Sequence, residues 1–148
     1  MGTIEGTASV EIDAPLATVW AVCEDVASAP LWQEGLQAME VIERDEEGRV
    51  AVADSVSDAK VRTVRSRVRF TYTASARVAW RQEEGDLKSL DGAWELEKLS
   101  ARRTRATYRL KGDPGRVLGM LVRGPVEARL RVILVDGRPD ELRRRVAG

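Results

Sequence analysis

The chain of 148 residues is long enough for one domain with a hydrophobic core of its own. Hydrophobic residues make up 43% of it and charged residues 32%, which is typical of a globular protein and excludes a disordered one. The 24 basic and 24 acidic side chains balance, so net charge favours neither nucleic acid nor an anionic membrane. We expect a single domain over residues 1–148 and no nucleic-acid partner.

The N-terminal segment, MGTIEGTASV, lacks the basic region and apolar stretch of a secretory signal. No apolar run approaches the ~18 residues that a membrane-spanning helix needs. We therefore expect a cytoplasmic protein, a monomer or a homodimer, that is not an integral membrane protein.

Three absences restrict the chemistry that the chain can carry. It contains no histidine, which excludes Ser-His-Asp and Cys-His catalysis and the commonest zinc sites. Its one cysteine, Cys23, allows no intrachain disulfide, and we expect it to be a small buried hydrophobic residue. The glycine-rich phosphate-binding motifs are also missing. We expect no metal and no cofactor, which leaves any chemistry to Asp, Glu, Arg, Tyr, Ser or water.

The first predicted elements are a strand and a helix. Residues Thr7–Ile12 alternate in polarity, which predicts a strand. Asp13 then provides an N-cap, and Pro15 a favourable first-turn residue, for a helix that should end near Glu24. The apolar face of this helix consists of Leu16, Val19, Trp20 and Cys23. The segment Ser28–Trp32 is broken by a proline and predicts a turn with a second short helical piece.

Six further extended segments follow, separated by turn residues such as Glu47-Gly48 and Gly85-Asp86. They are Leu36–Arg44, Val50–Ser57, Val61–Thr73, Ala76–Glu83, Lys88–Leu99 and Thr104–Lys111. With the first strand they give seven strands, and the short connections favour antiparallel hairpins over parallel crossovers.

Beyond Asp113-Pro114-Gly115 the apolar spacing changes to that of a helix. It predicts a long C-terminal helix over Val117–Val135, bent at Gly124-Pro125 and interrupted again at residues 136–139. A twisted antiparallel sheet with one apolar face needs a cover, and this helix is the only large element that can provide it. The predicted fold is α+β. It is a helix-grip, in which a seven-stranded curved antiparallel sheet wraps around a long C-terminal helix, with short helices after the first strand.

Four stretches in this order resemble the START-like superfamily, also described as polyketide cyclase/dehydrase or SRPBCC. They are VEIDAPLATVWAVCEDVASAPLWQEGL, EVIERDEEGRV, RVAWRQEEGDLKSLDGAWEL and TRATYRLKGDPG. The resemblance covers essentially the whole chain and rests on the order and spacing of the stretches. It implies a hydrophobic cavity between the sheet and the long helix, used for lipids, polyketides or other apolar molecules. It does not imply one reaction, because such folds carry many functions.

Three of the four arginines in the strand Val61–Thr73 alternate with an apolar row, so the two sets face opposite sides. We place on the concave, helix-facing side Val64, Val68, Phe70 and Tyr72, and in solvent Arg65, Arg67 and Arg69. Outward acids of neighbouring strands can pair with these arginines, among them Glu83, Glu95 and Glu97. With balanced charge and the aromatic residues on the other face, the arginines predict a solvated surface and not a nucleic-acid site.

Ser66 is the one small hydroxyl residue in the inward row of this strand. The strand resembles a W-x-S-x-R pattern of aromatase/cyclases, which implies a pocket-facing serine and arginine that assist cyclisation. Here the serine matches Ser66, but Val64 replaces the tryptophan and Val68 the arginine. A cation that would polarise a substrate carbonyl is therefore missing at that position. Ser66 is either a hydroxyl of the cavity wall or a catalytic group.

The remaining candidate cavity residues come from the alternation of faces along each predicted strand and from the apolar faces of the predicted helices. The predicted ligand-binding set is Trp20, Trp32, Val64, Ser66, Val68, Phe70, Trp80, Trp94, Tyr108, Met120 and Leu121. Gly92 would thin the wall where a ligand or the helix approaches closely. Simple core packing is the alternative for each aromatic residue. A cavity that serves a small ligand should measure on the order of 300–1,000 Å³.

Three functions fit these residues. The first is binding of a small hydrophobic molecule, such as a lipid or a polyketide-like compound, by a carrier or sensor. The second is a cofactor-independent polyketide cyclase or dehydratase that acts on a poly-ketone, for which the candidate catalytic residues are Ser66, Tyr72 and Tyr108. The third is a protein-interaction module whose cavity is filled by its own side chains.

Overall fold

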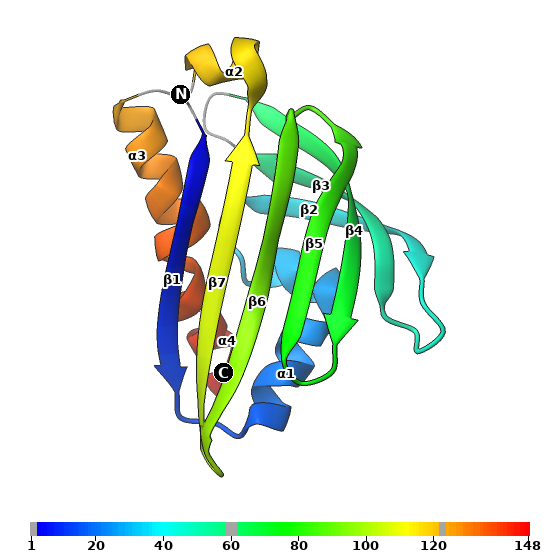
Figure 1. Ribbon diagram of the computed structural model, residues 1–148, viewed down its shortest axis with the longest axis vertical. Helices are drawn as coiled ribbons and strands as arrows, with labels where there is room; N and C mark the ends of the chain where they lie inside the picture. The colour runs from blue at the N-terminus through cyan, green and yellow to red at the C-terminus, as the bar shows by residue number, and fades with distance from the viewer. Residues whose placement is uncertain (1–2, 59–61, 122–123) are drawn as a thin grey trace.

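The computed structural model describes residues 3–58, 62–121 and 124–148 (Figure 1). Strand β1 (Ile4–Ile12) is followed by helix α1 (Leu16–Glu24) and by η1, a short 3-10 helix (Val26–Leu31). The next six strands are β2 (Leu36–Arg44), β3 (Val50–Asp58), β4 (Thr63–Thr73), β5 (Arg77–Gly85), β6 (Ser89–Ser100) and β7 (Arg103–Asp113). The C-terminal elements are α2 (Gly115–Leu121), α3 (Pro125–Arg131), η2 (Val132–Asp136) and α4 (Arg138–Ala147).

The seven strands form one antiparallel sheet in the order β1-β7-β6-β5-β4-β3-β2. Each strand from β2 to β7 pairs with the strand before or after it in the chain, as consecutive hairpins do. The first strand pairs with the last, which brings Ile4 opposite Gly112. The helices lie on one side of the curved sheet (Figure 1). The predicted α+β helix-grip fold is confirmed.

The predicted faces of β4 are also confirmed. Val64, Ser66 and Val68 are buried, whereas Arg65 and Arg69 are exposed. On the outer face the side chains of Arg67 and Arg69 meet acids of the neighbouring strands. The ion pairs are Arg67–Asp54 at 2.8 Å and Arg69–Glu83 at 2.7 Å. Exposed pairs of this kind contribute little to stability, so the arginines form the solvated side of the sheet.

Two of the acids predicted to pair with the β4 arginines lie beside other strands. Glu95 accepts a hydrogen bond from Arg109 at 2.6 Å, and Glu97 accepts one from Arg105 at 2.8 Å. Both donors are on β7, because β6 lies between β5 and β7 in the sheet and does not touch β4.

The predicted long C-terminal helix is divided into several pieces. Gly124 has φ 57°, which is the left-handed region that favours glycine, and α3 begins directly after it at Pro125. η2 is a turn of π-helix, and Gly137 separates it from α4. α3, η2 and α4 contact β1, and α4 also packs against α1 and β7. These last three pieces therefore cover the concave side of the sheet in place of one continuous helix.

Two clusters of buried apolar side chains lie between the helices and the sheet. One joins α1, α4 and the sheet, and includes Trp20, Ala106 and Leu142, which are 8%, 0% and 0% exposed. The other joins α3 and η2 to β1 and β4 through Ile4, Val64, Leu130 and Val135. The candidate site lies where residues of both clusters face a common space.

Candidate functional site

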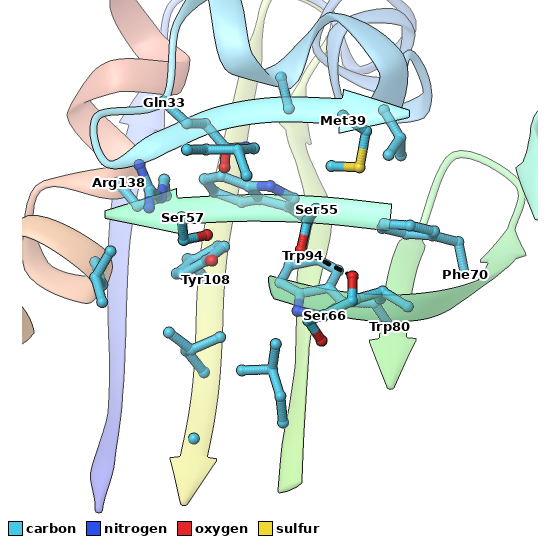
Figure 2. A pocket seen from close by; sticks show the side chains of 18 of the residues that line it. Gln33, Met39, Ser55, Ser57, Ser66, Phe70, Trp80, Trp94, Tyr108 and Arg138 are labelled. Atoms are coloured by element: carbon cyan, nitrogen blue, oxygen red, sulfur yellow. Dashed lines mark hydrogen bonds between the residues drawn. The ribbon is translucent and has the colours of Figure 1, made fainter. Parts of the chain in front are cut away.

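A cavity of about 190 Å³ lies between the sheet and the helices (Figure 2). Its wall includes Cys23, Trp94 and Tyr108 from the first cluster and Val64 and Leu130 from the second. The predicted range of 300–1,000 Å³ is wrong, since the cavity is smaller than that. The reason is that large aromatic side chains occupy much of the space under the sheet.

These aromatic side chains form a continuous row along the cavity. The ring centroids are 6.3 Å apart for Trp32–Trp94, 4.7 Å for Trp94–Tyr108, 5.6 Å for Trp80–Tyr108 and 6.3 Å for Phe70–Trp80. All four pairs are tilted, as aromatic pairs in protein cores prefer. We call these five residues the aromatic row. It gives the cavity a rigid apolar wall whose members come from β4, β5, β6, β7 and the segment after η1.

Gly92 makes room for one member of the aromatic row. It pairs with Trp80 across β5 and β6, and a Cβ at position 92 would lie 2.7 Å from the Trp80 ring. The close approach at Gly92 is made by the Trp80 ring and by the Arg109 carbonyl oxygen.

The hydroxyl of Ser66 faces the cavity but is already engaged. Its Oγ donates to Oε1 of Gln82 at 2.8 Å, and Nε2 of Gln82 donates to the Leu87 carbonyl at 2.9 Å. Ser55 donates to the backbone carbonyl of Ser66 at 3.3 Å. A serine nucleophile needs a neighbouring base, and the Gln82 amide cannot accept its proton. The geometry therefore favours a structural hydroxyl of the cavity wall.

Tyr108 is the central member of the aromatic row and is only 4% exposed. Burial raises the pKa of its phenol, and the positive charge of Arg138 and a hydrogen bond with the Arg138 side chain partly oppose this. The hydroxyl of Tyr108 therefore stays protonated at neutral pH, which makes it a hydrogen-bond donor in the cavity and not a base.

Arg138 is a cavity residue that the sequence analysis missed. It is 3% exposed, and it is the only Lys or Arg among the described residues that line the cavity. Its Nη1 donates to the Glu34 carbonyl at 2.9 Å and to Oε1 of Glu141 at 2.7 Å. Its guanidinium carbon lies 5.8 Å from the Tyr108 ring centroid. Figure 2 shows Arg138 at one end of the cavity, and Phe70 at the other.

One signal in the sequence could have pointed to Arg138. It occupies the first position of α4, where the helix dipole disfavours a cation. An acid three residues later, Glu141, compensates the charge. A cation in that position is unusual enough to suggest a specific role.

Most of the predicted ligand-binding residues lie on the cavity wall. These are Trp32, Val64, Ser66, Val68, Phe70, Trp80, Trp94 and Tyr108. That they contact a ligand stays a prediction.

Three members of the predicted set are not found on the cavity wall. Trp20 is in the packed cluster between α1 and the sheet, where core packing is the simpler explanation. Met120 is 63% exposed, because α2 is separated from α3 by the break at Gly124 and does not share its inward stripe. The side chain of Leu121 lies outside the described part of the chain.

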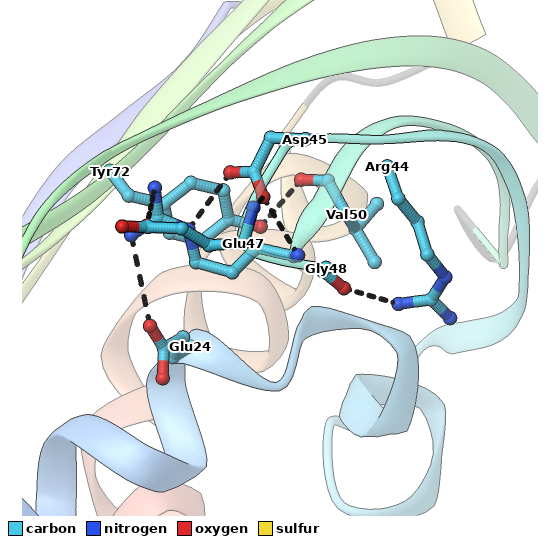
Figure 3. A network of polar contacts seen from close by, with 8 residues as sticks. Glu24, Arg44, Asp45, Glu47, Gly48, Val50 and Tyr72 are labelled. Carbon is cyan, nitrogen blue, oxygen red and sulfur yellow. Dashed lines mark hydrogen bonds and ion pairs between the residues drawn. The ribbon is translucent and has the colours of Figure 1, made fainter.

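Tyr72, a candidate catalytic residue, does not line the cavity. Its hydroxyl donates to the Val50 carbonyl at 2.6 Å, and Arg49 lies over its ring with the guanidinium carbon 4.5 Å from the centroid. Arg49 also bonds to Asp45 and lies 3.8 Å from Glu24 of α1 (Figure 3). Burial is the largest cause of a raised pKa of the Tyr72 phenol. Tyr72 therefore fixes the β2–β3 hairpin against β4 and α1.

Cys23 lines the cavity from α1 and is 4% exposed, which agrees with the predicted small buried hydrophobic residue. Burial raises the pKa of its thiol, so the reactive thiolate is suppressed. Within the described residues, no three His, Cys, Asp or Glu side chains are grouped as metal ligands. The same residues form no helix with the length and apolar character to span a bilayer.

The model of the polyketide cyclase / dehydrase and lipid transport family matches residues 12–136. The chain belongs to this family. The predicted membership of the START-like superfamily is thereby confirmed, and the family's description supports either binding of a hydrophobic ligand or a cyclase role. A comparison with the curated proteins found no match.

Solved structures with the same fold come from several bacteria. A START superfamily protein from Mycobacterium smegmatis is 17% identical, with a TM-score of 0.81 and 97% of each chain covered. A protein from Thermus thermophilus is 21% identical, with a TM-score of 0.80 and 97% of each chain covered. The Zhui aromatase/cyclase from a Streptomyces species is 18% identical, with a TM-score of 0.77 and coverage of 98% of this chain and 94% of that chain. At these identities the likeness shows the fold of this family member.

Proposed function

We propose that the protein binds a small hydrophobic molecule in the cavity, as a carrier or sensor. The observation that carries this proposal is the aromatic row, which lines one wall of an otherwise mainly aliphatic space. Sites for small ligands are typically concave and apolar, with a few well-placed polar groups. The family's description, which includes lipid transport, supports the same function.

The volume of the cavity sets the size of the ligand. A dry cavity of roughly 150 Å³ accommodates benzene, so about 190 Å³ has room for a molecule with one or two rings. Burying about 250 Å² of apolar ligand surface gains about 6 kcal/mol, from which the loss of translational and rotational freedom must be subtracted. We therefore expect weak to moderate affinity for a purely apolar compound, and binding assays should be designed for that range.

A second candidate function is cyclisation or dehydration of a poly-ketone. The family's description favours it, and four hydroxyl residues, Ser55, Ser57, Ser66 and Tyr108, lie on the cavity wall. Positioning of a flexible substrate alone can accelerate an intramolecular reaction. Val68 at the position of the cyclase arginine and the small volume both weigh against this function. Loss of a measurable cyclisation in a Ser66→Ala variant that still binds ligand would favour the enzyme.

A third candidate is an interaction module with a filled cavity. The observation in its favour is that the aromatic row reduces the free space to about 190 Å³. It differs from the first candidate in predicting no small-molecule binding at all.

Native mass spectrometry of the purified protein tests the proposed function. We expect a fraction of the protein to carry an apolar compound, or the empty protein to take up added tetralin, a two-ring hydrocarbon. A protein that neither carries a compound nor binds tetralin at near-saturating concentration would overturn the proposal and favour the interaction module.

A further inference from the structure

We propose that Arg138 hydrogen-bonds a neutral carbonyl oxygen of the bound molecule, so that the cavity selects apolar ligands that carry a ketone or ester group. This inference rests on the proposed binding function and adds the chemical class of the ligand. It is drawn from the bonding state of Arg138, its position and the charges around it.

The first observation is an unused donor. Arg138 is 3% exposed, and its Nε has no hydrogen-bond partner among the described residues. Buried N–H groups almost always have an acceptor, and one left without a partner is costly, the more so on a charged group. Because Arg138 lines the cavity, an acceptor on a ligand can complete its bonding.

The second observation is the position of this donor at one end of the cavity, beside the central member of the aromatic row. The guanidinium carbon is 5.8 Å from the ring centroid of Tyr108, and Tyr108 is in turn next to Trp94 and Trp80. In Figure 2, Arg138 lies at the same end of the cavity as Gln33 and Ser57. A ligand with its polar atom at Arg138 would lay its apolar body along the rings. The site therefore matches a molecule with one polar end.

The third observation is that the charge of Arg138 is already compensated. Glu141 accepts from its Nη1 at 2.7 Å through Oε1, and Oε2 of Glu141 accepts from the Glu34 backbone N–H at 2.9 Å. A further acid, Asp25, also lines the cavity. A carboxylate ligand would meet these acids without an unpaired cation to offset its desolvation. A neutral carbonyl oxygen accepts the Nε–H bond without that cost.

The test compares three probes of similar shape: 1-tetralone, tetralin and 1,2,3,4-tetrahydro-1-naphthoate. A hydrogen bond from a charged donor should make 1-tetralone bind about tenfold more tightly than tetralin. The carboxylate should bind more weakly than the ketone. Titration calorimetry measures the three affinities. Infrared spectroscopy of the bound ketone should show its C=O stretch at lower frequency than in an apolar solvent.

Variants then assign the preference to Arg138. The double variant Arg138→Met, Glu141→Met removes the pair together, so that no buried acid is left without its partner. It should lose the preference for 1-tetralone and the infrared shift, with its affinity for tetralin measured alongside as the reference. Arg138→Lys keeps the charge but has no Nε–H, and should also lose most of the preference. Arg49→Met is the matched control, because Arg49 is another aromatic-stacked arginine away from the cavity, and it should keep the preference.

The outcomes separate this inference from the proposed function. Equal binding of tetralin and 1-tetralone by the wild-type protein would overturn the inference and leave the binding function in place. A preference that survives in Arg138→Lys or in the double variant, or tighter binding of the carboxylate, would overturn it too. If the wild-type protein binds none of the probes, the proposed function and this inference both fail. Should the double variant not fold, the wild-type probe comparison and Arg138→Lys still decide the matter.

Discussion

The indole ring of Trp80 lies against the backbone of Gly92, its partner across the β5–β6 pair, so that a Cβ at position 92 would come within 2.7 Å of the ring. The same Cβ would lie 2.7 Å from the Arg109 carbonyl oxygen on the next strand. Backbone on one side and a packed indole on the other leave no room for a side chain. The glycine thus fixes where one ring of the aromatic row can lie.

We therefore predict that Gly92→Ala destabilises the protein by about 1–3 kcal/mol, the usual cost of overpacking. The matched control is Gly112→Ala on β7, where a Cβ would meet only Leu90 at 3.5 Å, an ordinary contact. Urea unfolding of both variants measures the difference. Equal stabilities would show that the Trp80 ring moves aside without cost.

The sheet could be predicted from the sequence because each strand alternates in polarity and ends at a turn signal. The predicted strand Leu36–Arg44 coincides with β2, and β5 differs from its prediction by only one or two residues at its ends. The predicted strand Val61–Thr73 ends at Thr73, as β4 does, and its predicted first residue, Val61, lies outside the described residues. Polarity alternation has a period of two, and the arginines of β4 made that period easy to recognise. The division of the C-terminal helix could also be predicted from local residues, since Gly124-Pro125 and Gly137 break a helix.

The polar end of the cavity could not be predicted in this way. Arg138 acquires its role through the Glu34 carbonyl, which is 104 residues away in the chain, and through a ring on β7. Nothing local in the sequence specifies those partners. The cavity volume likewise depends on how the five rings pack together. The alternation of residues along a strand predicts only the face of the sheet on which each ring lies.

On β4 we predict a ranking of three substitutions by their effect on stability. Val68→Arg should be the most harmful, by several kcal/mol, because it buries an unpaired cation at a site that is 3% exposed. Ser66→Ala should cost about 1 kcal/mol, since the Gln82 amide oxygen loses its donor. Arg67→Glu should have the smallest effect, because position 67 is on the solvated face. Chemical denaturation measures all three, and a larger loss for Arg67→Glu than for Val68→Arg would mean that the faces are wrongly assigned.

Both tyrosines should ionise at a higher pH than an exposed tyrosine does. The chain contains two, Tyr72 and Tyr108, and burial raises the pKa of each above the usual value of about 10. Their neutral forms are favoured in the folded state, so this contribution to stability is complete below pH about 10 and is lost as the pH rises through the folded pKa values. We expect little tyrosinate absorbance from the native protein near pH 10, and a normal titration in urea. Native tyrosines that ionise as they do in urea would contradict the burial described for them.

The most direct test of the central claim, that the cavity binds a small hydrophobic molecule, is a calorimetric titration of tetralin into two matched variants. Leu110 on β7 lines the cavity, whereas Leu96 on β6 packs against the same core cluster away from it, and both are partly buried. Leu110→Trp should fill the space and abolish binding, while Leu96→Trp and the wild-type protein should bind with similar affinity, with near-UV circular dichroism to confirm that both variants are folded. Undiminished binding by a folded Leu110→Trp variant, or no binding by the wild-type protein, would contradict the claim.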